Sequence, residues 1–188
     1  MKKLIYLLVL CMIVFTGCTF NQNKDTYKIK NDEQLVQIME QYSNEKSVQD
    51  LNAITDYLVE SEMLLQSSNA KAPLQGFYIG ILKDSPDEFK LQTKRKITPS
   101  FESILKSSKA FSGDMELILS GEQTYYPEYP AFLDMLWGYY YSTGDDRVIK
   151  MMCKIKDKDI DKTIRASAKW SLEAHKQKFP DKIKGCYN

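Results

Sequence analysis

The 188-residue sequence is poor in residues that form turns and in residues that catalyse. It has eight glycines, six prolines and a single histidine, His175. So few turn residues argue against an all-β sandwich, which needs a turn about every ten residues. One histidine and no Gly-x-Ser-x-Gly motif argue against a nucleophilic triad, and no glycine-rich phosphate loop is present. We therefore predict neither a β-sandwich nor an enzyme.

The sequence also has no excess of charge of either sign. It contains 26 lysines and arginines against 25 aspartates and glutamates. A near-neutral chain has no overall field that would attract nucleic acid, so no nucleic-acid partner is predicted. Asp157, Asp159 and Asp161 alternate as in a calcium loop, but the glycine and the closing glutamate of that pattern are missing. No metal and no cofactor are predicted.

The first eighteen residues have the layout of an export signal. Lys2 and Lys3 precede an apolar run from Leu4 to Phe15, and the small residues Thr16 and Gly17 follow it. The run is about a dozen residues long, whereas a permanent membrane-spanning helix needs roughly 20. We therefore expect a cleaved signal peptide, with an uncleaved membrane helix as the less favoured reading.

The end of this signal, Val14-Phe15-Thr16-Gly17-Cys18, resembles the lipobox of bacterial lipoproteins. Phe15 stands where that pattern more often has leucine. The resemblance implies that Cys18 carries a diacylglyceryl group and fatty acyl chains such as palmitate, and that the mature chain begins there. It also implies a place in the bacterial cell envelope, at the outer membrane facing the periplasm or on the outer face of a single cell membrane. Ordinary secretion is the alternative.

The expected domains follow from this signal: residues 1–17 as signal peptide, 18–30 as polar tether and 31–188 as one helical domain. Removal of Cys11 and acylation of Cys18 would leave Cys153 and Cys186 as ordinary thiols. In an oxidising compartment these two could form a disulfide. The alternative is two separate thiols, with Cys153 buried. A zinc site is disfavoured because there is one histidine and no Cys-x-x-Cys motif.

Apolar residues recur at helical spacing through most of the chain. The pattern predicts an all-α fold of stacked helical hairpins, arranged as a right-handed α/α superhelix or as an irregular bundle. Expected caps are Asn31 or Asp32, Ser47, Thr98 and Asp145, and expected stops are Gly121 and Gly144. We expect a helix from Ser47 to Leu65, one starting at Pro73, one from Thr98 through Leu105 and a last one from Asp159 to Phe179. Met115–Leu119 is predicted as either helix or strand.

Two segments of the second half resemble a group of bacterial all-helical proteins of unassigned function. They are Leu133–Ile149, with its Leu-Asp-x-x-Trp and Thr-Gly-Asp elements, and Ala166–Leu172, with Ala-x-Trp-Ser-Leu. The resemblance implies a helical fold and no particular activity. Trp170 is expected to pack among small alanines against neighbouring helices.

Tyrosines are concentrated before and within a helix that is expected to include Phe132 to Tyr141 and to stop at Gly144. Tyr125, Tyr126 and Tyr129 precede it, and Tyr139 to Tyr141 lie inside it. The rings could line the boundary of the core, with hydroxyls meeting water. Alternatively, the first three could contact a partner, since tyrosine is common at interfaces.

Together these patterns predict a membrane-anchored, non-catalytic protein-binding module of a scaffold, inhibitor or immunity type. Its partners would be the membrane, through the lipid on Cys18, and a protein. One alternative is an accessory subunit or enzyme of cell-envelope metabolism. Another is a small-ligand-binding protein with a pocket lined by Trp137 and Trp170.

Overall fold

The computed structural model describes residues 28–61, 65, 67–95, 97–121, 130–157 and 161–187. The regular elements of these ranges are all helical, so the protein is all-α as predicted. In chain order they are α2 (Asp32–Glu45), α3 (Val48–Glu60), α5 (Ser68–Asp84), α6 (Pro86–Thr93), α7 (Pro99–Ser120), α8 (Ala131–Thr143), α9 (Arg147–Asp157), α10 (Lys162–His175), α11 (Pro180–Ile183) and the 3₁₀ helix η2 (Lys184–Cys186).

The helix ends form largely where the sequence predicts them. The side chains of Asn31, Ser47 and Thr98 each accept a hydrogen bond from a backbone N–H in the first turn of α2, α3 and α7. Gly121 and Gly144 end α7 and α8 in the left-handed conformation, with φ of 82° and 69°. These two positions need glycine because a Cβ is strained at positive φ.

Several predicted boundaries are wrong. Pro73 lies inside α5, which begins at Ser68, because packing of the following turns against α8 stabilises the helix on both sides of the ring. Met115–Leu119, predicted as either helix or strand, is helical, but it continues α7 without a break and is not a separate element. The helix that begins after Ser47 ends at Glu60, before Leu65, and α10 ends at His175, before Phe179.

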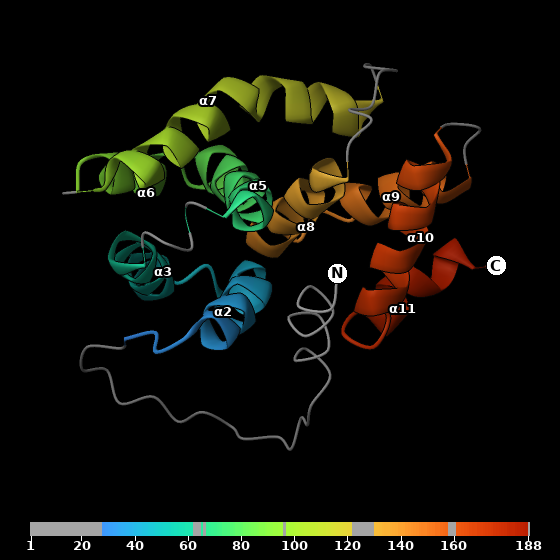
Figure 1. Ribbon diagram of the computed structural model, residues 1–188, viewed down its shortest axis with the longest axis horizontal. Coiled ribbons are helices and arrows are strands. Elements are labelled where there is room, and N and C mark those ends of the chain that lie inside the picture. Colours follow the sequence, from blue (N-terminus) through green and yellow to red (C-terminus); the bar gives the residue numbers. More distant parts are fainter. Residues whose placement is uncertain are drawn as a thin grey trace.

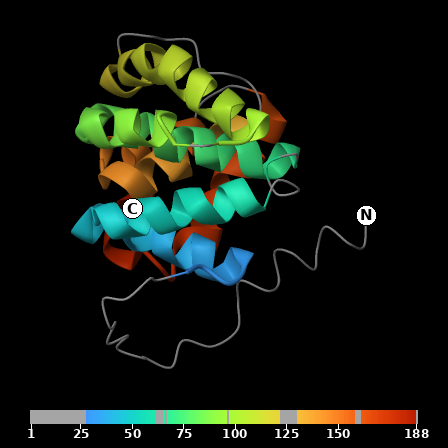
Figure 2. The same cartoon turned by 90° about the vertical axis from the view of Figure 1, so that its left-hand side faces the viewer.

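Helix α8 forms the centre of the molecule. Ten of its thirteen residues are buried, so it is apolar around most of its circumference, as expected for a helix inside a core. It packs against α5, α2, α9 and α10 (Figure 1). In a superhelix each unit contacts only its neighbours, whereas α2 reaches α8 from far away in the sequence. The arrangement is therefore an irregular bundle, with α7 on one side of α5 and the α2–α3 pair on the other (Figure 2).

The backbones of α5 and α8 touch where glycines face the opposite helix. Gly76 and Gly80 lie four residues apart on α5, and Gly138 lies on α8. A Cβ on Gly138 would fall 1.8 Å from the carbonyl oxygen of Pro73, and one on Gly76 would fall equally close to a backbone carbonyl of α8. Small residues at this spacing let two helices approach more closely than larger side chains allow. This contact fixes the centre of the fold.

Along the described stretches of chain, no helix combines the length and apolar content needed to cross a membrane.

Candidate functional site

Most of the predicted site residues lie outside the described residues. These are the lipidation site Cys18 and the tyrosines Tyr125, Tyr126 and Tyr129. Gly121 and Pro130, which flank the tyrosine segment, are both described and exposed. The other three tyrosines, Tyr139 to Tyr141, are buried in α8 as the core interpretation predicts, but the hydroxyls of Tyr139 and Tyr141 bond Lys83 and His175 instead of water.

Cys153 and Cys186 are joined by a disulfide in the structure. Cys153 lies on α9 and Cys186 in η2, with their Cα atoms 5.1 Å apart. The Lys156 ammonium donates a hydrogen bond of 2.7 Å to the carbonyl oxygen of Cys186. The bridge ties the C-terminal residues to α9, and the Cys186 and Ile183 side chains are buried in the core.

The disulfide belongs to a compact C-terminal unit, which we define as residues 147–187. Within it α9 and α10 pack side by side, and α11 follows α10 after a turn (Figure 1). Ion pairs join the unit to the rest of the bundle, among them Lys178 to Glu40 on α2 at 2.5 Å and Lys182 to Asp146 at 2.8 Å.

The sole histidine lies where this unit meets α8. The His175 ring stacks on Trp137, with centroids 3.7 Å apart and planes 12° apart. Its Nδ1 donates to the carbonyl oxygen of Ser171 at 2.8 Å, so its Nε2 accepts from the Tyr141 hydroxyl at 2.7 Å. The Trp137 indole N–H donates to the Ser171 hydroxyl at 2.6 Å.

Both ring nitrogens of His175 are therefore occupied by protein groups. Burial lowers the pKa of His175 to about 4, and the nearby Lys178 ammonium acts in the same direction. The ring is neutral at pH 7, yet no nitrogen is left to take a proton from a bound molecule. These contacts make His175 a packing residue, as its place on an amphipathic helix predicts.

A second polar cluster joins four helices at one end of α8. The Arg147 guanidinium bonds both Glu116, at 2.6 Å, and Asp145, at 2.6 Å. Lys83 contacts Glu116 at 3.0 Å and donates to the Tyr139 hydroxyl at 2.8 Å. Hydrogen bonds from Arg147 lower the pKa of Glu116. The charges of the two cations and the two carboxylates cancel, so the cluster is best explained as a structural link between α5, α7, α8 and α9.

The largest difference from the sequence prediction is Trp170, which was expected to pack between helices. It is 56% exposed on the outward face of α10, whereas Trp137 is 3% exposed. The two tryptophans therefore do not line a common pocket. Exposed neighbours of Trp170 on the same side of α10 are Lys162, Thr163, Ala166, Lys169, Glu173 and Ala174.

Charge is distributed unevenly although the whole chain is near neutral. The described residues of the C-terminal unit contain eleven lysines and arginines against four aspartates and glutamates, a formal surplus of seven positive charges. Residues 28–61, which include α2 and α3, contain three against seven, a surplus of four negative charges. α3 and α10 lie at opposite ends of the longest axis (Figure 1). The molecule is electrically polar along its length.

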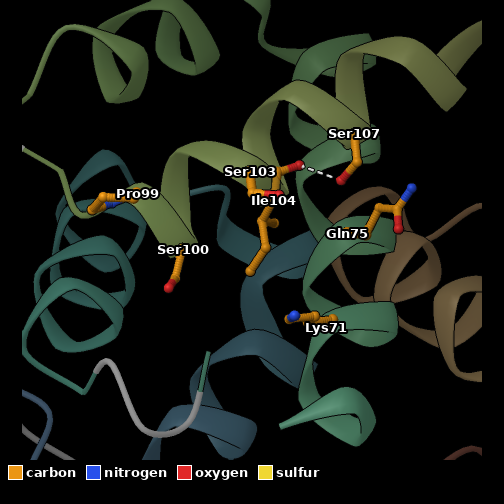
Figure 3. Close-up of a pocket in the computed structure, with 7 residues that line it drawn as sticks. All are labelled: Lys71, Gln75, Pro99, Ser100, Ser103, Ile104 and Ser107. Carbon is orange, nitrogen blue, oxygen red and sulfur yellow. Dashed lines mark hydrogen bonds between the residues drawn. The ribbon is translucent and has the colours of Figure 1, made fainter. Parts of the chain in front are cut away.

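A pocket of about 360 Å³ lies between α5 and the beginning of α7 (Figure 3). It is lined by Lys71, Gln75, Pro99, Ser100, Ser103, Ile104 and Ser107. Its volume is in the range of small-ligand sites, but such sites are mostly apolar and bury the ligand. This hollow is open, and the Lys71 side chain at its edge is exposed. We assign no ligand to it.

Among the residues with described positions, no group of three or more histidine, cysteine, aspartate or glutamate side chains could hold a metal ion. Comparison of the chain with models of protein families, with curated proteins and with solved structures found no match.

Two features of the surface escaped the sequence prediction. The regional charge could have been found by summing charges over segments, because positive residues dominate from Arg147 onward. The exposure of Trp170 could have been found from the helical period alone. The buried residues Ile164, Ala168 and Leu172 define one side of α10, and Trp170 falls on the other.

Proposed function

We propose that this protein is a lipid-anchored bacterial lipoprotein that works outside the cytoplasm as a non-catalytic protein-binding module. The observation that carries the location is the pairing of Cys153 with Cys186. Disulfides persist in oxidising compartments and are rare in the cytosol. The pairing is independent of the export signal, so two separate features of the chain support the same compartment.

The lipid on Cys18 would supply the anchor. Two or more acyl chains bind a membrane firmly, whereas a single chain binds only marginally. The chain between Cys18 and the first described residue, Lys28, is polar and suits a tether.

The protein partner would bind the tyrosine segment, residues 125–129. The described chain before this segment is α7, which ends at Ser120 and is capped by Gly121, and the described chain after it is Pro130 and α8. Both helices are rooted in the core, so the segment connects two fixed points. Tyrosine gives a large contact area at a low entropic cost, which suits a stoichiometric binder that scaffolds or blocks its partner.

Crosslinking and pull-down from intact cells tests both the lipid anchor and the tyrosine contact. The wild type should recover one envelope protein, and Tyr125→Ser/Tyr126→Ser/Tyr129→Ser should lose it. Tyr57→Ser/Tyr187→Ser, on other surfaces, is the matched control and should retain it. Cys18→Ala should leave the membrane fraction. Membrane association that persists in Cys18→Ala would refute the lipid anchor, and equal recovery by the triple variant would refute the tyrosine contact.

A further inference from the structure

The outward face of α10 carries an apolar residue that the fold does not use. Trp170 is 56% exposed, and the residues one turn away on either side, Ala166 and Ala174, are exposed too. Because alanine side chains are short, the indole stands out from the helix surface. Lys162 and Lys169 lie along one edge of this face.

These lysines belong to a larger set of uncompensated positive charges. Five exposed lysines of the C-terminal unit form no ion pair with another described residue: Lys150, Lys154, Lys162, Lys169 and Lys184. The acidic side chains nearest to this face are already engaged. Glu173 pairs with Lys176 and accepts from the Tyr187 hydroxyl, and Asp161 caps α10. The described part of the unit therefore presents a net positive field and two exposed aromatic rings, of which Trp170 is more exposed than Tyr187.

We propose that this face of α10 lies on an anionic phospholipid bilayer, with Trp170 at the level of the headgroups and Lys162 and Lys169 beside their phosphates. Tryptophan is enriched at the membrane–water interface because its ring is amphipathic. A lysine near an anionic leaflet contributes about 1 kcal/mol of attraction. Charge complementarity thus selects the partner.

The shape of the face favours a bilayer over an acidic protein. Hot-spot tryptophans at protein interfaces are centred in well-packed contacts ringed by other residues. Here the Trp170 ring stands out from a convex helix, and the described pocket lies elsewhere, between α5 and α7. A bilayer requires no matching shape, because lipids rearrange around a single inserted side chain.

The described chain begins far from this face. The described chain begins with residues 28–61, which carry the negative surplus, and their helix α3 lies at the opposite end of the long axis, where the same lipids would repel it (Figure 1). The ten residue steps from Cys18 to Lys28 span about 35 Å at most. A lipid on Cys18 would hold the domain close to the membrane, and the α10 face would set which side faces it.

Lipid binding by this face goes beyond the proposed function and does not depend on acylation. The test therefore uses the chain from residue 18 onward with Cys18→Ser, which keeps every described residue. Co-sedimentation compares vesicles of phosphatidylcholine with vesicles containing about one third phosphatidylglycerol. We expect binding to the anionic vesicles alone, weakened several-fold when salt is raised from about 0.1 M to about 0.5 M.

Variants locate the contact. Lys162→Gln/Lys169→Gln should weaken binding about tenfold or more, and Trp170→Ala should weaken it several-fold. The matched controls are Lys90→Gln/Lys109→Gln, two exposed lysines of α6 and α7, and Leu91→Ala, an apolar residue 52% exposed. Both controls should bind like the parent. Circular dichroism verifies that each variant is folded.

Fluorescence gives a second readout, because the chain has two tryptophans and Trp137 is already buried. Emission should shift to shorter wavelength on anionic vesicles, and Trp170→Phe should bind without that shift. Equal binding to both vesicle types, or equal loss in the controls and the α10 variants, would overturn the proposal. So would α10-dependent binding to polyglutamate without binding to vesicles, which would assign the face to an acidic protein. Failure of the lipid anchor would appear separately, in the cellular fractionation of Cys18→Ala.

Discussion

The α5–α8 contact and the C-terminal unit are held together by different means. Between α5 and α8 the backbones meet at Gly76 and Gly138, with no room for one added carbon atom. The C-terminal unit is tied by a disulfide, by ion pairs to α2 and Asp146, and by the stack of His175 on Trp137. The first region depends on close packing, and the second on a few specific links.

The difference indicates where each region tolerates change. A close-packed contact is destabilised when a residue is replaced by a larger one, because the neighbouring backbones cannot move aside. A unit held by discrete links keeps its shape while its outer surface varies, so residues on that surface are available for contacts outside the fold. Trp170 and the unpaired lysines of α10 lie on such a surface.

The largest expected effect is at the glycine contact. Gly138→Ala places a methyl group 1.8 Å from the Pro73 carbonyl oxygen, so it should destabilise the protein by at least about 3 kcal/mol in urea unfolding, or prevent folding. Gly113→Ala is the matched control, because nothing lies within 4 Å of its new Cβ in the interior of α7. The control should stabilise by about 0.5–1 kcal/mol. Similar effects of the two changes would contradict the packing argument.

The second largest effect on stability is expected when the disulfide is removed. It closes a separation of 33 residues, so Cys153→Ser/Cys186→Ser should lower the free energy of unfolding by about 3 kcal/mol. Adding a thiol reductant to the wild type should give a similar loss and should leave the double variant unchanged. If the wild type from the cell envelope reacts with a thiol-alkylating reagent before reduction, the two cysteines are not paired there.

His175 should make stability depend on pH. Its pKa falls from 6.5 in the unfolded chain to about 4 in the fold, so between these values the unfolded state binds more protons and stability decreases as pH falls. The loss should reach about 2 kcal/mol at pH 5 and level off below pH 4. Groups facing the ring are the Tyr141 hydroxyl, the Ser171 carbonyl and the Lys178 ammonium.

His175→Gln tests this directly, because it removes the titrating ring and keeps every carboxylate. The slope of unfolding free energy against pH between 4 and 6.5 should become shallower than in the wild type. Parallel slopes would mean that carboxylates alone cause the loss in acid.

The smallest effect is expected at Trp170. Because its side chain contributes little to the core, Trp170→Ala should change the free energy of unfolding by less than about 0.5 kcal/mol. Leu172→Ala, two residues further along α10 and fully buried, should cost about 2–5 kcal/mol. A comparable loss from both would show that Trp170 supports the fold.

Local signals explain which elements could be predicted. α8 follows from apolar residues at helical spacing and from Gly144, which ends the helix by its own conformational freedom. Thr98 and Pro99 mark the start of α7 in the same way. Each of these signals acts within a few residues of the chain, so the sequence contains it directly.

The remaining features depend on distant partners. Gly76 and Gly80 are visible as a pair of small residues, but their meaning comes from Gly138, some sixty residues later in the sequence. Pro73 alone predicts a helix start. Tertiary packing instead keeps α5 helical on both sides of Pro73. The alanines near Trp170 could equally have lined a helix interface or, as the structure has it, a free surface.

The Gly76–Gly138 arrangement also has a consequence for how the chain folds. The two strongest contact partners, α5 and α8, are separated by α6, all of α7 and the tyrosine segment. Closing so long a loop carries an entropic cost that local helix formation does not repay, which slows folding. A growing or translocating chain that ends before Gly138 lacks the part of α8 against which α5 packs. Whichever compartment receives it, the chain can form the α5–α8 contact only after Gly138 has arrived.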